Sequence, residues 1–162
     1  MKVKTGLLTL LLFFSTILTI RTQTRNEIRL SRDDFDFSRL VLLKEINKLD
    51  MKFPHIVFSQ ALLETGNFSS KLFQDYNNLF GMKVPLKRES LARGKTKAGY
   101  AKYEFWSNSI YDYFLWQTYM MEKHKVKTEK QYFTLLGKVY SQDKGYVLRV
   151  KRVLKENKDI LN

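Results

Sequence analysis

One stretch of the sequence, residues 54–81, determines where one helix ends and the next begins. Pro54 suits the first turn of a helix because its φ is fixed near the helical value, and the run HIVFSQALLE continues from it. Residues 65–67, Thr-Gly-Asn, end that helix, since glycine adopts the backbone conformation of a helix C-terminus most easily. We therefore predict a helix that runs from Pro54 to Glu64.

Glu64 has the setting of a carboxyl group with a raised pKa. Gln60 lies four residues before Glu64, so the two side chains project from one face of the helix. Glu64 is in the last turn, where the negative end of the helix dipole disfavours a charged carboxylate, and Leu62, Leu63 and Phe68 are near enough in sequence to exclude water. Both effects raise a carboxyl pKa, as a proton donor near neutral pH requires. Judged by its spacing alone, Glu64 is more often expected to be a solvated residue at a frayed helix end than a proton donor.

Apolar residues recur at helical spacing along much of the remaining chain. The pattern predicts helices at residues 38–50, 71–76, 108–125, 129–140 and 145–157. Ser69 or Ser70 is the expected cap of the second of these helices, and Ser107 of the third. Residues 82–102 have glycines and a proline but little apolar periodicity, so they predict a small β-hairpin or an irregular loop. The chain is therefore expected to be mainly α-helical.

The segment 82–102 is also strongly basic. It has one acid, Glu89, against seven basic residues: Lys83, Lys87, Arg88, Arg93, Lys95, Lys97 and Lys102. Either it is a solvated basic loop in which Arg88 pairs with Glu89, or it is one wall of a cleft that attracts a polyanion. The net charge of +13 favours polyanionic partners in general. Because no nucleic-acid-binding module is recognisable, we expect no nucleic-acid partner, and envelope anions fit better.

The N-terminus predicts export. Lys2 and Lys4 precede the uncharged apolar run Gly6–Ile20, as in a secretory signal, and their removal would leave a net charge of +11 (13 − 2). The run of 15 residues is marginal for a membrane span, which needs about twenty, and Thr22-Gln23-Thr24 is a poor cleavage site. Residues 1–24 are thus a signal peptide or an uncleaved anchor that gives membrane association, with a buried core helix as the remaining alternative. We expect a linker at 25–34, one domain at 35–162, and a location in the periplasm or cell envelope.

No metal or cofactor is expected. The chain has no cysteine, which excludes a disulfide framework, a thiolate metal site and a cysteine nucleophile. Its two histidines, His55 and His124, are far apart and lack the spaced partners of a metal site.

Four segments, in order, resemble one enzyme family. QALLETGNFSSKL (60–72) followed by YNNLFGMK (76–83) is similar to the active-site segment of the glycoside hydrolase family 73 glucosaminidases, the flagellar-hydrolase-like peptidoglycan hydrolases. Their pattern is roughly Q-A-x-x-E-[ST]-G, then N-x-F-G-[IM]-K. The residues that fall on it are Gln60, Ala61, Glu64, Thr65, Gly66, Asn78, Phe80, Gly81 and Lys83. WSNSIYDYFLW (106–116) and YSQDKGYVLRVKRVL (140–154) look like its later helical signatures, so the resemblance covers about residues 53–154.

The resemblance implies a fold and a reaction. The fold is a lysozyme-like, mainly helical single domain with a small β-hairpin or irregular lobe beside the cleft. The reaction is cleavage of the β-1,4 bond after N-acetylglucosamine in peptidoglycan glycan strands, with Glu64 as the general acid. The second group is Glu89, the only acid in residues 82–103, with Glu104 as the fallback. The substrate's own 2-acetamido group is the other alternative.

The resemblance also assigns supporting roles. Tyr146 matches the family's late tyrosine, which stabilises the transition state or positions the acetamido group, with partial burial against a neighbour as the alternative. Asn78 and Phe80 are expected to shape the floor of the cleft, and Gly81 to allow a backbone turn that a side chain would block. Gln60 either orients Glu64 or the substrate, or is a polar core group.

Trp106 and Tyr111 are the candidates for stacking on sugar rings, although most aromatic residues of their helix are expected in the core. Two rival functions stay open: a muramidase or lytic transglycosylase that uses the same glutamate, and a non-catalytic wall-binding module. Nothing in the sequence predicts the oligomeric state.

Overall fold

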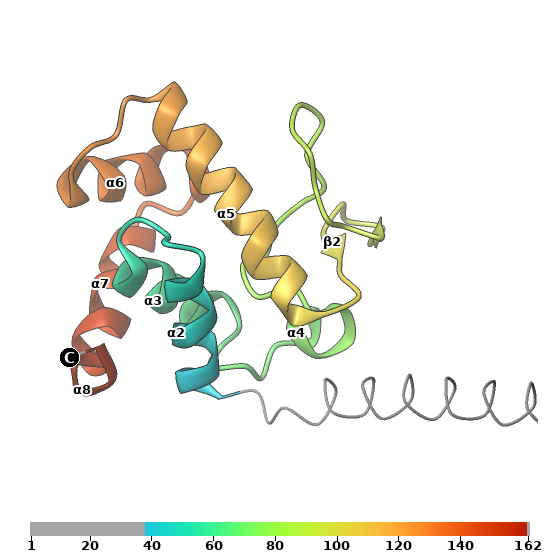
Figure 1. Cartoon of the computed structure of the whole chain (residues 1–162), viewed down its shortest axis with the longest axis horizontal. Coiled ribbons are helices and arrows are strands. Elements are labelled where there is room, and N and C mark those ends of the chain that lie inside the picture. The colour runs from blue at the N-terminus through green and yellow to red at the C-terminus, as the bar shows by residue number, and fades with distance from the viewer. Residues whose placement is uncertain (1–37, 162) are drawn as a thin grey trace, which may run out of the picture. The chain divides into compact units, whose positions relative to one another are not determined.

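The computed structural model describes residues 38–161 and is mainly helical (Figure 1). Its elements in chain order are α2 (Arg39–Lys48), α3 (Pro54–Glu64), α4 (Lys71–Tyr76), β1 (Gly94–Lys95), β2 (Ala101–Lys102), α5 (Trp106–Lys123), α6 (Glu129–Leu135), the π-helical turn η1 (Leu136–Tyr140), α7 (Tyr146–Glu156) and α8 (Lys158–Leu161). This confirms the mainly α-helical class with a small β-hairpin. The predicted leader at 1–24 and linker at 25–34 lie outside the described residues.

Helix α3 is the buried helix of the domain. It packs against α2 and α7, and Ile56, Val57, Phe58 and Ala61 have no exposed surface. A helix that is apolar on most sides needs cover on most sides, which explains why the neighbouring helices enclose it. The side chain of Glu64, at the end of this helix, is therefore held by a rigid element.

The start and end of α3 agree with the prediction. Pro54 is its first residue, after Phe53 in the left-handed conformation (φ 53°), and Glu64 is its last. The Thr65 hydroxyl donates to the Ala61 carbonyl at 2.7 Å, and Gly66 follows at φ 55°. A left-handed residue just after a helix is its usual stop signal, and here it turns the chain away directly after Glu64.

The segment between α4 and α5 forms the small lobe that the sequence predicts. Ser70 caps α4, since its Oγ accepts from the Phe73 N–H at 3.3 Å. Strands β1 and β2 pair antiparallel, with Gly94 opposite Lys102 and Lys95 opposite Ala101. In the view of Figure 1, this lobe lies on one side of α5, and α6 and α7 lie on the other.

The predicted cap of α5 is wrong. Ser107 is already inside the first turn, because the helix begins at Trp106. The side-chain oxygen of Asn108 reaches back and accepts from the Phe105 N–H at 3.1 Å, so the capping group comes from inside the helix. This is the return half of a capping box, which a search for a serine before the helix does not detect.

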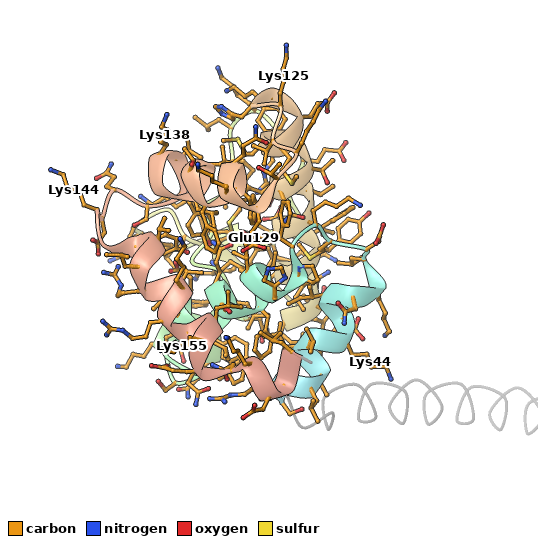
Figure 2. The ribbon with its side chains drawn as sticks, turned by 90° about the vertical axis from the view of Figure 1, so that its left-hand side faces the viewer. Lys44, Lys125, Glu129, Lys138, Lys144 and Lys155 are labelled. Atoms are coloured by element: carbon orange, nitrogen blue, oxygen red, sulfur yellow. The ribbon has the colours of Figure 1, made fainter. Side chains whose placement is uncertain are left out.

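The C-terminal helices enclose the core. Ile56 of α3, Tyr132 of α6, Leu136 of η1 and Val150 of α7 belong to one buried cluster and have no exposed surface. Basic side chains project outward, as Lys125, Lys138, Lys144 and Lys155 do in Figure 2. Among residues 38–161, no helix has the length and apolar character that a membrane span needs.

Candidate active site

Glu64 is partly exposed, and its pKa is raised from the ordinary value of 4.5. The main cause is burial, which penalises the charged form. Two interactions oppose the increase: a side-chain hydrogen bond with Tyr146 and the positive charge of Arg149. The raised pKa that the sequence predicts is thus confirmed, and its chief cause is desolvation.

Tyr146 connects Glu64 to the core. It is the first residue of α7 and is 3% exposed, and its hydroxyl bonds both Glu64 and the Gln60 amide, whose Nε2 donates at 2.9 Å. Burial and the nearby Glu64 charge raise the pKa of Tyr146 well above its ordinary value. The phenol therefore stays protonated at all working pH values and has one proton to donate.

Gly81 lies against the Glu64 carboxyl group. Its φ is 62°, and a Cβ at this position would lie 3.2 Å from Glu64 Oε2. The predicted need for glycine is confirmed, with an additional reason: the backbone approaches the carboxylate so closely that a side chain would crowd it.

Asn78 and Phe80 lie in the core, each at most 1% exposed. Asn78 Nδ2 donates to the carbonyls of Met82 and Ala101, both at 2.9 Å, and its Oδ1 accepts from the Met82 N–H at 3.0 Å. Phe80 stacks on Tyr113, with ring centroids 4.1 Å apart. Both side chains therefore support the turn that carries Gly81 and have almost no surface to offer a sugar.

Gln60 is also fully buried, and its side chain bonds two tyrosines. Its Nε2 donates to Tyr146, and its Oε1 accepts from the Tyr113 hydroxyl at 2.5 Å. Of the alternatives that the sequence left open, orientation of Glu64 through Tyr146 fits this geometry.

The two further acids that the sequence proposed are on the surface of the lobe. Glu89 is exposed, and Arg88 bonds its backbone carbonyl at 2.7 Å while forming an ion pair with Asp112 at 2.6 Å. The expected Arg88–Glu89 side-chain pair is therefore replaced by a pair with Asp112, which is fully buried. Glu104 pairs with Arg93 at 3.1 Å. Neither glutamate is among the groups that dominate the pKa of Glu64.

The aromatic candidates on α5 differ in exposure. Tyr111 is 43% exposed, with its ring 6.0 Å from that of Phe114. Trp106 begins the helix and is partly buried. Of the two, Tyr111 has the more exposed side chain, and its role in stacking on a sugar stays a prediction.

Sequence reasoning missed Arg149. It lies three residues after Tyr146, on the same face of α7, and its charge acts on Glu64. Its Nη2 is held by Asp143 Oδ2 at 2.5 Å. The sequence shows Arg149 three residues after Tyr146, but the basic residues of this helix were expected to face solvent, so Arg149 was not predicted to lie near Glu64.

Glu64 does not line either of the two hollows described on the surface. One, of about 650 Å³, is lined by residues of α6, η1 and α7 that include Phe133, Val147 and Lys151. Another, of about 220 Å³, lies around Val126 and Lys138. None of the predicted site residues lines either of them.

Comparison with known proteins identifies a matching family and a similar solved structure. The model of the glucosaminidase family, described as mannosyl-glycoprotein endo-beta-N-acetylglucosaminidase, matches residues 42–159, well over half of the chain. Among solved structures, the catalytic domain of the autolysin Auto from Listeria monocytogenes is similar, with a TM-score of 0.51 and 17% sequence identity over 86% of this chain and 96% of that one. The two share the lysozyme-like fold. Comparison with curated proteins found no match.

Proposed function

We propose that this chain, which belongs to the glucosaminidase family of glycoside hydrolases, cleaves the β-1,4 bond that follows N-acetylglucosamine in peptidoglycan, with Glu64 as the general acid. The observation that carries the proposal is the setting of Glu64: a partly exposed carboxyl group at a rigid helix end, with a pKa raised by burial and a tyrosine bound to it. A raised pKa favours the protonated form of the carboxyl group, which is the form that a general acid needs.

Protonation of the leaving oxygen is the step that Glu64 performs. Glycosidic bonds break through an oxocarbenium-like transition state, and the departing oxygen needs a proton as the bond lengthens. The hydroxyl of Tyr146 donates to the carboxyl group, and this hydrogen bond favours release of the acid proton. After the proton has left, the same hydrogen bond and the Arg149 charge stabilise the carboxylate.

The 2-acetamido group of the substrate is our proposal for the second catalytic group. The groups that act most strongly on Glu64 are a tyrosine and an arginine, and Glu89 and Glu104 are exposed on the lobe. A neighbouring acetamido oxygen can attack the anomeric carbon without a protein carboxylate. The hydroxyl of Tyr146 is already bonded to Gln60 and Glu64, so we assign it to Glu64 and not to the acetamido group.

The proposed substrate and location agree with the charge of the protein. A net charge of +13 favours association with the anionic polymers of a bacterial envelope. The similar solved structure is named as the catalytic domain of an autolysin, which supports a cell-wall glycan as the substrate. We propose export to the periplasm or envelope from the leader-like composition of the N-terminus.

The test is digestion of purified peptidoglycan by the full chain, with Glu64→Gln beside it and mass spectrometry of the reduced products. We expect fragments that end in reduced N-acetylglucosamine, with at least about a 100-fold loss of activity in the variant. Gln keeps the shape of the side chain but has no acidic proton, so a folding defect is not expected.

Other products would favour the rival functions. Reduced N-acetylmuramic acid ends would indicate a muramidase, and anhydromuramyl ends a lytic transglycosylase. Binding to the wall without soluble fragments from either protein would indicate a non-catalytic module.

A further inference from the structure

Gln117 of α5 has its amide orientation fixed by the backbone of Lys52. Gln117 Oε1 accepts from the Lys52 N–H at 3.1 Å, and its Nε2 donates to the Lys52 carbonyl at 2.8 Å. Because a backbone N–H only donates and a carbonyl only accepts, the amide cannot be turned over without losing both bonds. The side chain of Gln117 is 2% exposed, so water does not substitute for them.

A chain of buried hydrogen bonds runs from this amide to Glu64. Gln117 Nε2 donates to the Tyr132 hydroxyl at 2.9 Å, and Tyr132 and Tyr113 share a bond of 2.8 Å. The Tyr113 hydroxyl donates to Gln60 Oε1 at 2.5 Å, and Gln60 Nε2 donates to Tyr146 at 2.9 Å. The links come from four helices, α5, α6, α3 and α7, that are far apart in the sequence.

The fixed amide determines the direction of every bond in the chain. Each tyrosine hydroxyl has one proton, and that of Tyr132 is fully buried, so it must find an acceptor. Since the oxygen of Tyr132 accepts from Gln117, its proton goes to Tyr113. The proton of Tyr113 then goes to Gln60 Oε1. The reverse direction would leave the Tyr132 proton unpaired in the core, which is unfavourable.

This direction determines what Tyr146 can do. With Gln60 Oε1 facing Tyr113, Nε2 faces Tyr146, whose oxygen is thereby an acceptor for Gln60. Its one proton is left for Glu64, which the Tyr146 hydroxyl also bonds. Tyr146 therefore donates to the carboxyl group.

We propose that Gln117 is a positioning residue that acts on Glu64 through Tyr132, Tyr113, Gln60 and Tyr146, and fixes Tyr146 as a donor to the carboxyl group. The assignment rests on the proposed function, in which Glu64 is the general acid. A donor stabilises the carboxylate more than the neutral acid, so the chain holds the pKa of Glu64 below the value that burial alone would give it. If the chain could reverse, Tyr146 would accept from the neutral acid and raise that pKa.

The test breaks the chain at two points remote from Glu64. Gln117→Met removes the fixed amide while keeping its length, and Tyr132→Phe removes one link without changing the ring. The full chain, labelled with ¹³C at the glutamate carboxyl, is titrated by NMR, and Glu64→Gln identifies the Glu64 signal. We expect the Glu64 titration to move to higher pH in Gln117→Met, because no fixed donor then directs the Tyr132 proton toward Tyr113. In Tyr132→Phe the Tyr113 proton still has Gln60 Oε1 as its acceptor, so the titration should stay where it is in the wild type. The double variant should also keep the wild-type titration, because Gln117 acts on Tyr113 only through the Tyr132 hydroxyl.

Tyr103→Phe is the matched control. Its hydroxyl is also buried, with the residue 5% exposed, and donates to Asp112 at 2.5 Å, outside the chain. It also loses a buried tyrosine hydrogen bond, here one to a carboxylate, and should leave the titration of Glu64 where it is in the wild type.

The basic limb of the pH profile of kcat/KM gives the second measurement. That limb should follow the NMR titration to higher pH in Gln117→Met and stay in place in Tyr132→Phe. An unchanged Glu64 titration in folded Gln117→Met, an equal shift in Tyr103→Phe, or a shift that persists in the double variant would overturn the proposal. If Gln117→Met does not fold, Gln117→Glu, which offers Tyr132 an oxygen acceptor in place of Nε2, decides in its place. Because the NMR titration needs no substrate, it decides this assignment even if the proposed reaction is wrong.

Discussion

The backbone of Gly81 lies so close to Glu64 that a Cβ at this position would be 3.2 Å from the Glu64 Oε2 atom. The residue also has a φ of 62°, which disfavours any side chain. Two requirements for glycine, the positive φ and the close approach to Glu64, thus coincide at this position. Substitutions at Gly81, Gly99 and Gly94 separate the effects of the two.

Gly81→Ala should lower kcat/KM by about 10–100-fold, since a small displacement of a reacting group has effects of this size. Gly99→Ala tests strain alone, because Gly99 has a φ of 86° and a Cβ added there would meet no other group within 4 Å. It should lose about 1–2 kcal/mol of stability with activity largely kept. Gly94→Ala should change neither stability nor activity, because a Cβ there would meet no other group within 4 Å and the φ of Gly94 is not positive. Peptidoglycan digestion and urea unfolding measure the two effects, and equal activity in all three variants would contradict the role of the close approach.

Glu64→Gln should be more stable than the wild type at pH 7. The folded-state pKa of Glu64 is raised, so the folded protein binds the proton more tightly than the unfolded chain does. Stability therefore falls as the pH rises from the ordinary value of about 4.5 through the folded-state pKa, and this loss is absent in the glutamine variant. Thermal unfolding at pH 7 should give the variant the higher Tm, with the difference gone near pH 4. A variant less stable at pH 7 would show that the charge of Glu64 is well compensated.

The lobe should depend on the buried Asp112. Its carboxylate accepts from Arg88 at 2.6 Å, from Ser90 at 3.1 Å and from Tyr103 at 2.5 Å, and Asp112 has no exposed surface. Asp112→Asn leaves the largely buried guanidinium of Arg88 without its counter-charge, so we expect a loss of about 3 kcal/mol in urea unfolding.

The matched control is Glu104→Gln, which breaks the exposed pair with Arg93 and should change stability by about 0–1 kcal/mol. Proteolysis within residues 83–102 should become faster only in Asp112→Asn. Equal effects of the two variants would contradict an anchoring role for Asp112.

The features that the sequence predicted correctly are local. Pro54, Thr65 and Gly66 begin and end α3 through backbone preferences that act within a few residues, so the position of Glu64 could be read directly. The same holds for the cap at Ser70 and the turn at Gly81.

The features that the sequence could not give are pairings between distant segments. The sequence placed most aromatic residues of α5 in the core, but it carried no information on the partners that α6 and α3 would bring to Tyr113 and Gln117. Arg88 has an acid beside it in the sequence and yet pairs with Asp112, 24 residues later. The family resemblance identified Tyr146 but not Arg149, whose proximity to Glu64 emerges only when α7 packs on α3.

The identity of the second catalytic group can be decided by two conservative changes in the lobe. Glu89 is exposed, and Glu104 is paired with Arg93 on the surface, so neither shares the partly buried setting that raises the pKa of Glu64. If the acetamido group of the substrate is the nucleophile, Glu89→Gln and Glu104→Gln should each keep kcat/KM within about tenfold of the wild type. Glu64→Gln should lose at least about 100-fold. A loss in Glu89→Gln as large as that in Glu64→Gln would assign the second role to Glu89, because a required nucleophile or base cannot be replaced by an amide. It would also require the lobe to carry Glu89 to the substrate.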